Sequence, residues 1–297
     1  MILIFVILLG IALLLYFFNF KVIHYSNLML VSGAVKGGKS LFSLYIAERK
    51  WRSLHFSWFL RTKILPYCLP FSKNKRKQLK EIEEPLFYTN IHVAFKHVML
   101  DTDYLLRKKR FNYKSVIFID EASLTADSQN FKDMFTNDNL LLFNKLIGHE
   151  THGGYLFYNT QSVQDLHYSI KRCITKYYWI DRCIKWIPFI VVFKMKEMVY
   201  SEDGSMVNVN GLQEHKDEED CMRTLIISKR YFKHYDRYAF SILTDNLKDK
   251  HPRIVVNKVG DYLKCDEIVS FKDWELVKDK SNYTSDGKLR KERIKHD

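Results

Sequence analysis

The segment that decides the fold is a glycine-rich turn between an apolar run and a helical pattern: Gly33-Ala34-Val35-Lys36-Gly37-Gly38-Lys39-Ser40. The preceding residues, Asn27–Ser32, have the length and composition of a short buried strand, and Leu41–Arg52 have the apolar spacing of a helix. A strand, a turn of this GxxxxGKS type and a helix in this order form a phosphate-binding loop. We therefore predict an α/β fold with a mostly parallel central sheet, that of a P-loop NTPase of the RecA-like or ASCE type.

The loop predicts a site for ATP and Mg²⁺. Backbone N–H groups of the turn and of the helix N-terminus would hold the phosphates. Lys39 would reach the β- and γ-phosphate oxygens, and the Ser40 hydroxyl would ligate Mg²⁺. The predicted nucleotide-binding residues are Gly33, Ala34, Val35, Lys36, Gly37, Gly38, Lys39, Ser40 and Leu41.

A second apolar strand, Ser115–Ala122, ends in two carboxylates, Asp120 and Glu121. A continuous apolar run is typical of a central parallel strand that is buried on both faces. We expect Asp120 to hold the Mg²⁺ shell, and Glu121 to orient and deprotonate the attacking water.

A third predicted strand, Gly154–Gln161, ends in polar residues that a parallel sheet would bring beside the nucleotide. Gln161 or Thr160 would then sense the γ-phosphate through the hydrolytic water; alternatively, these residues only open a turn. A helix predicted to begin near Ser162 leads to Arg172, which either acts in trans as an arginine finger on a neighbouring subunit or is a solvated side chain at a helix end.

The N-terminal segment, residues 1–20, has no charged side chain and as a helix would reach about 30 Å at ~1.5 Å per residue. We predict a single-pass transmembrane anchor; a cleaved signal peptide is the alternative, but no basic n-region precedes the run. Lys21 and the basic remainder place the N-terminus outside and the rest of the chain in the cytoplasm. Five scattered cysteines without a CxxC pair are typical of a reduced compartment.

The net charge of +13 indicates an anionic partner, either nucleic acid or the inner leaflet of a membrane. Two basic clusters, Ser72–Lys80 and Arg107–Arg110, lie in a basic insertion at about 52–114. They would contact phosphate backbones or acidic headgroups. We divide the chain into the anchor 1–20, an ATPase domain 21–250 with a β-hairpin at about 187–209, and a partly flexible basic extension 251–297. The apolar stretch Trp186–Val192, too short to span a membrane, is predicted to be a core strand.

Several of these segments together resemble the zonula occludens toxin (Zot)-like family, which includes assembly protein I of filamentous phages and resembles the FtsK/HerA branch of P-loop motors. The similarity covers about residues 28–180 and rests on the phosphate loop, Phe118-Ile119-Asp120-Glu121-Ala122, His149-Glu150-Thr151-His152-Gly153-Gly154, Thr160-Gln161 and Ile170-Lys171-Arg172. Unlike family members with a transmembrane helix after the ATPase domain, this chain has its candidate anchor at the N-terminus.

The resemblance implies a membrane-anchored ATPase at the host cell inner membrane. Such an ATPase powers the translocation of single-stranded phage DNA during the assembly and extrusion of virions. Its implied partners are coat and other phage assembly proteins, the lipid membrane and further copies of itself in a ring. One alternative is a DNA-packaging or conjugative translocase of double-stranded DNA. Another is a nucleotide-dependent membrane scaffold that recruits assembly proteins without processive turnover.

Overall fold

The computed structural model describes residues 10, 22–33, 37–68, 72–91, 93–100, 111–125, 134–164, 166, 168–200, 206–208, 222–234 and 268–269. A sheet of ten strands forms the centre of this part of the chain, in the order β10-β3-β2-β4-β5-β1-β6-β7-β8, with β9 paired to β7. The strands are β1 Leu28–Gly33, β2 Phe87–Thr89, β3 His97–Met99, β4 Val116–Ile119, β5 Tyr155–Asn159, β6 Lys176–Ile184, β7 Ile190–Tyr200, β8 Met206–Asn208, β9 Met222–Ser228 and β10 Ile268–Val269.

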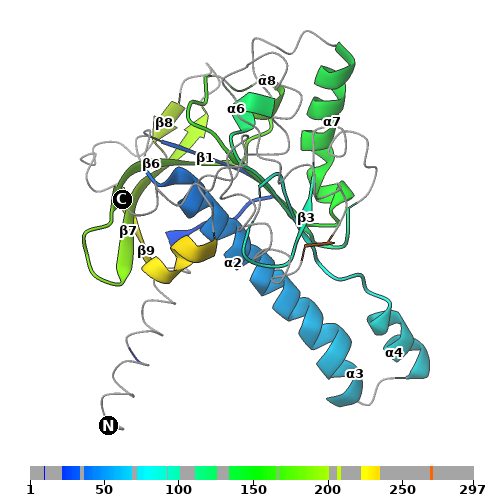
Figure 1. Cartoon of the computed structure of the whole chain (residues 1–297). Coiled ribbons are helices and arrows are strands. Elements are labelled where there is room, and N and C mark those ends of the chain that lie inside the picture. The colour runs from blue at the N-terminus through cyan, green and yellow to red at the C-terminus, as the bar shows by residue number, and fades with distance from the viewer. Residues whose placement is uncertain are drawn as a thin grey trace, which may run out of the picture.

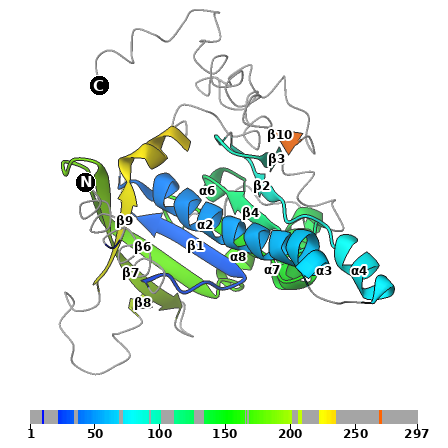
Figure 2. The same cartoon turned by 90° about the horizontal axis from the view of Figure 1, so that it is seen from below.

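The helices surround this sheet on both faces (Figure 1). They are α2 Lys39–Phe59, the π-helical turn Leu60–Ile64, α3 Leu65–Cys68, α4 Lys73–Lys80, α6 Ala122–Thr125, α7 Met134–Glu150, α8 Tyr168–Lys171 and the 3-10 helix η4 Lys229–His234. Seen from below, α2 lies in front of the sheet, and α7 and α8 lie behind it (Figure 2).

The order of the strands supports the predicted fold class. The neighbours from β3 through β2, β4, β5 and β1 to β6 all pair in parallel, whereas β7 pairs antiparallel with β6, β8 and β9, and β10 pairs antiparallel with β3. Strand β5 lies between β1, which leads into the glycine-rich turn, and β4, which ends in the carboxylates. One strand inserted between these two is the arrangement of the RecA-like or ASCE division that the sequence predicts.

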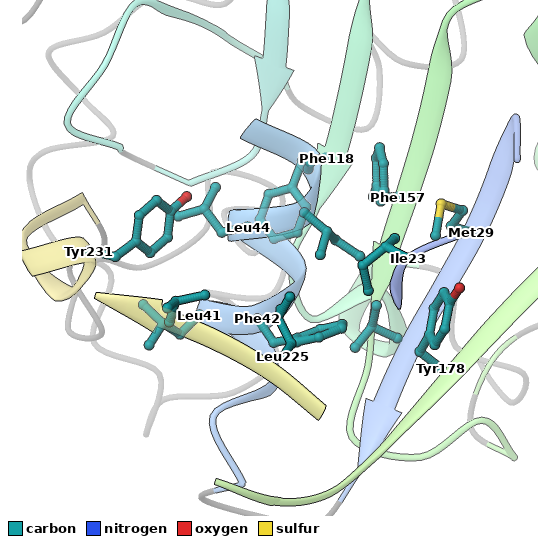
Figure 3. Close-up of a cluster of buried hydrophobic side chains, with 14 of the residues drawn as sticks. Ile23, Met29, Leu41, Phe42, Leu44, Phe118, Phe157, Tyr178, Leu225 and Tyr231 are labelled. Carbon is teal, nitrogen blue, oxygen red and sulfur yellow. The ribbon is translucent and has the colours of Figure 1, made fainter. Parts of the chain in front are cut away.

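Two buried clusters hold the layers together. Side chains of β1, β4, β5 and β6 that point to one face pack on α2 and β9, and their neighbours along the strands pack on α6, α7 and α8 on the other face. This alternation follows from the period of two in a strand, which sends successive side chains to opposite faces. Ile23, ahead of β1, also lies in the cluster on the α2 side, near Met29 and Tyr178 (Figure 3).

The strands predicted after the third strand are also present. Residues 176–180 belong to β6, and residues 225–228 belong to β9. The predicted hairpin over 187–209 corresponds to β7 and β8, which pair antiparallel; its predicted turn at Asp203-Gly204 lies outside the described residues.

Three local predictions differ from the structure. The helix after the loop continues past Arg52 to Phe59 and through the π-helical turn into α3, because no glycine or proline interrupts it before Pro66. The helix expected near Ser162 does not begin there, because residues 161–164 are not helical and α8 begins at Tyr168. The core strand expected over 186–192 begins at Ile190, so Trp186 and Phe189 lie on the exposed turn between β6 and β7.

The predicted transmembrane segment 1–20 lies outside the described residues, apart from Gly10. Among the helices that the structure describes, none is both long enough and apolar enough to cross a bilayer. The basic cluster 107–110 and nearly all of the extension 251–297 also lie outside the described residues.

Candidate nucleotide site

The glycine-rich turn lies between the carboxyl end of β1 and the first residue of α2, as the motif predicts. Gly38 caps α2 with a left-handed backbone at φ 79°, and a Cβ there would lie 2.9 Å from a ring carbon of Phe193 and 3.1 Å from the sulfur of Cys183. Only glycine fits both the conformation and the close packing of β6 and β7 against the loop. Gly33 is equally confined, because a Cβ would lie 2.4 Å from the carbonyl oxygen of Ile180. Ala34, Val35 and Lys36 lie outside the described residues.

Lys39 is buried at the first position of α2, with 7% of its surface exposed. Burial lowers the pKa of its ammonium group, whereas the nearby carboxylates of Glu121 and Asp120 raise it. Lys39 and the N-terminus of this long helix are groups that attract an anion such as a triphosphate, whereas the two carboxylates beside them attract a cation.

Asp120, directly after β4, is held through its backbone by Asn90, directly after β2. The Asn90 side-chain amide donates to the Asp120 carbonyl at 2.9 Å, and the Asp120 N–H donates to the Asn90 side-chain oxygen at 2.8 Å. Both residues are buried. This reciprocal pair joins the carboxyl ends of two neighbouring parallel strands and sets the position of the carboxylate.

Asn159, the last residue of β5, joins the loop to the acidic strand. Its Nδ2 donates to Ser40 Oγ at 3.0 Å and also to Asp120 Oδ1. Its buried Oδ1 has no hydrogen-bond partner among the described residues. The sheet thus collects a hydroxyl, a carboxylate and a free amide oxygen in one place. Hard oxygen groups of this kind are the ligands that Mg²⁺ prefers, so these residues fit the ion that the motif implies.

Glu121 and Gln161 face each other across the same edge of the sheet. Gln161 Nε2 donates to Glu121 Oε1 at 3.3 Å, and Glu121 has a left-handed backbone at φ 50°, which is unusual for a residue with a side chain. Burial raises the pKa of the Glu121 carboxyl, and Asp120 raises it further, while the Gln161 hydrogen bond and Lys39 lower it. Backbone strain and a perturbed pKa together are frequent at catalytic positions.

The neighbouring Thr160 is directed elsewhere. Its side chain is buried, and its Oγ1 donates to the carbonyl of Ser162 at 3.0 Å within the turn that follows β5. Of the two side chains predicted as sensors, the structure therefore brings Gln161, and not Thr160, to the carboxylate Glu121.

Arg172 lies at the opposite end of the strands. Its side chain is exposed and borders a cavity together with Asn27 and Leu28, where β1 begins, and Thr175, ahead of β6. The loop follows the other end of β1. Because a strand of six residues is roughly 20 Å long at ~3.3 Å per residue, Arg172 does not reach the candidate nucleotide site of the same chain.

The predicted site residues do not include Asn90 and Asn159, although Asn159 lies near the end of the predicted strand Gly154–Gln161. Position at the carboxyl end of a parallel strand was the available signal, because such ends meet at one edge of a sheet. These two amides act through the carboxylate and the hydroxyl that they hold, and the motif pattern does not include them.

No protein-family model matches the chain, and no curated protein matches its sequence. Among solved structures, the N-terminal domain of zonular occludens toxin from Neisseria meningitidis is similar, with 14% identity, 72% of this chain and 100% of that chain covered, and a TM-score of 0.36. The genome packaging NTPase of Sulfolobus turreted icosahedral virus 2 in complex with AMP has 11% identity, 63% and 98% coverage, and a TM-score of 0.33. A KaiC-like protein from Pyrococcus horikoshii has 12% identity, 61% and 88% coverage, and a TM-score of 0.29.

Proposed function

We propose that the protein hydrolyses ATP at the edge of the sheet where β1, β4 and β5 end. The observation that carries this proposal is the hydrogen-bonded chain from Ser40 through Asn159 to Asp120, beside the buried Lys39 and the Glu121–Gln161 pair. Six side chains meet there, two from the first turn of α2 and four from the carboxyl ends of β4 and β5, and all are of types that phosphoryl transfer uses.

Each group has a separate task in this reaction. Lys39 and the N-terminus of α2 bind the phosphates and neutralise charge on the transferred group. Ser40 and Asp120 would hold Mg²⁺, which would supply positive charge to offset that of the phosphates. Glu121 accepts the proton of the attacking water, and Gln161 holds the Glu121 carboxylate in position.

The cargo is single-stranded phage DNA. Hydrolysis drives its translocation during assembly and extrusion of virions at the host cell membrane. The high positive charge, the apolar segment 1–20 ahead of the ATPase and the resemblance of the motifs to the Zot-like family support this finer proposal. The working form is a homo-oligomeric ring that contacts coat and other assembly proteins. The anchor 1–20 places the ATPase domain 21–250 and the extension 251–297 in the cytoplasm.

ATP hydrolysis by the purified full-length protein in lipid vesicles tests the site. Lys39→Ala and Glu121→Gln should each abolish hydrolysis, and Glu121→Gln should still bind nucleotide. Lys145→Ala, a change of an exposed lysine on α7, is the matched control and should retain full activity. Full activity in either site variant would refute the proposed residues.

The cargo and the topology have separate tests. Single-stranded oligonucleotides should stimulate hydrolysis more than duplex DNA of the same length does. Stronger stimulation by duplex DNA would contradict the proposed cargo. In intact cells, an epitope at the C-terminus should resist external protease. Cleavage of that epitope would refute the proposed orientation.

A further inference from the structure

Exposed large apolar side chains gather on one side of the molecule. Among the described residues, seven of the eight belong to the arm formed by the C-terminal half of α2 and its continuation to α3, to η4, or to the turn between β6 and β7. The arm, η4 and this turn all lie on the lower side of Figure 1, whereas α7 is at the upper right. The seven are Phe56, Phe59, Ile64, Tyr67, Trp186, Phe189 and Phe232; the eighth, Leu142, lies on α7.

The turn between β6 and β7, which we call the hairpin tip (residues 185–189), presents its aromatic rings at an energetic cost. Trp186 is 82% exposed and Phe189 is 84% exposed. Phe189 has a left-handed backbone at φ 63°, and the N–H of Lys229, the first residue of η4, donates to its carbonyl at 2.8 Å. A left-handed backbone is an outlier for a bulky residue, and such strain persists mainly at functional sites.

Positive charge accompanies these apolar residues. Lys185 in the hairpin tip and Arg230 in η4 are both exposed. Helix α4, which follows the arm, carries five exposed basic side chains and no acidic one: Lys73, Lys75, Arg76, Lys77 and Lys80. Apolar and aromatic side chains bordered by cations are typical of segments that rest in the interface of an anionic bilayer.

The chain also enters the folded domain on this side. Ile23 is buried in the cluster on the α2 side, and the carbonyl of Val22 accepts from Arg223 of β9 at 2.9 Å. In the sequence, the apolar segment 1–20 ends two residues before Val22. Strand β9 pairs with β7, where Ser228 lies opposite Ile190 beside the hairpin tip and Arg223 lies opposite Met195, five residues further along β7.

We propose that the α2 side is a membrane-docking face, on which the hairpin tip inserts among lipid headgroups and α4 binds anionic ones. This inference rests on the membrane location in the proposed function. A bilayer fits this face better than DNA does, because Ile187 and Pro188 extend the apolar surface of the tip without offering a ring on which a base stacks. Since Gly38 packs against Cys183 and Phe193 of the same hairpin, docking would also support the phosphate loop.

Quenching of Trp186 by brominated lipids tests the docking face. The full-length protein is reconstituted into vesicles of phosphatidylcholine and phosphatidylglycerol, with or without bromine on the acyl chains next to the headgroups. The emission of Trp186 is obtained by subtracting the emission of the Trp186→Phe variant from that of the wild-type protein. This variant keeps an aromatic ring at the tip. This emission should lose most of its intensity in brominated vesicles. Lys73→Gln combined with Lys77→Gln should reduce the loss.

The matched control places a tryptophan on the opposite side, as Leu142→Trp in the Trp186→Phe background. The emission that Leu142→Trp adds should be equal in vesicles with and without bromine. Equal Trp186 emission with and without bromine, in protein that floats with the vesicles, would overturn the docking face and leave the anchor intact. Failure to float would overturn the membrane location as well. Quenching of Trp186 by oligothymidylate, without quenching by brominated lipid, would assign the tip to nucleic acid instead.

Discussion

At the residue scale, Asn159 holds the two groups that would bind the metal ion. Its amide donates to both Ser40 and Asp120. We expect Asn159→Ala to lower kcat for ATP by roughly 10- to 100-fold and to raise the Mg²⁺ concentration required, because residues that hold metal ligands in position have effects of this size. Steady-state hydrolysis across a Mg²⁺ titration measures both quantities.

Asn144→Ala is the control for this prediction. Asn144 is a buried asparagine on α7 whose side-chain oxygen accepts from the Tyr158 hydroxyl at 2.9 Å, on the other face of β5. Its loss should lower stability by about 1–3 kcal/mol while the Mg²⁺ requirement stays unchanged. Equal Mg²⁺ requirements in Asn159→Ala and the wild-type protein would contradict the bridging role.

The Glu121–Gln161 pair predicts a pH dependence of hydrolysis. A general base must be ionised, so the rate falls as pH falls through the pKa of Glu121, which burial raises above its ordinary value. The Gln161 hydrogen bond lowers this pKa. Gln161→Ala should therefore move the acidic limb of the kcat profile to higher pH, and an unchanged limb would exclude coupling between the two side chains.

At the scale of the elements, β3 contains a buried neutral histidine that makes stability depend on pH. Burial lowers the pKa of His97 to about 4, and its Nδ1 lies 2.7 Å from the Phe95 carbonyl. Between this value and the ordinary pKa of about 6.5, the unfolded chain binds the proton and the folded chain does not, so stability is lost as pH falls.

We expect this histidine to remove about 2 kcal/mol from the free energy of unfolding between pH 7 and pH 5. Urea unfolding at both pH values, compared with His97→Gln, isolates the contribution. The variant should lose less stability over this interval. An identical loss in the two proteins would show that His97 is not the group that titrates.

At the scale of the whole molecule, the position of Arg172 requires a neighbour if this residue takes part in hydrolysis. Arg172→Ala alone should reduce hydrolysis strongly, as for an arginine finger. A mixture of Arg172→Ala with Lys39→Ala should regain part of the activity, because a subunit with an intact loop would receive Arg172 from the other variant. A mixture that remains as inactive as its components would refute the role in trans.

Much of the site was accessible from the sequence, because its motifs depend on short-range chemistry. Gly38 is left-handed at the N-cap of α2 as the loop motif requires, and Asp120 follows a buried strand as its apolar run predicts. The exposed tip at Trp186 was predicted to be a strand because an apolar run looks the same whether it is buried in a sheet or presented on a turn.

The sequence by itself determined the strand-loop-helix unit, the acidic strand and the class of chemistry, since each depends on residues that are adjacent in the chain. Only the tertiary structure decided that β5 lies between β1 and β4, that Asn90 and Asn159 hold Asp120, and that Gln161 rather than Thr160 faces Glu121. The physical reason is distance along the chain: Asn90 and Asp120 are 30 residues apart, and Asn159 and Ser40 are 119 residues apart. Contacts of this range depend on the order and register of strands, which local patterns of apolar and polar residues do not specify.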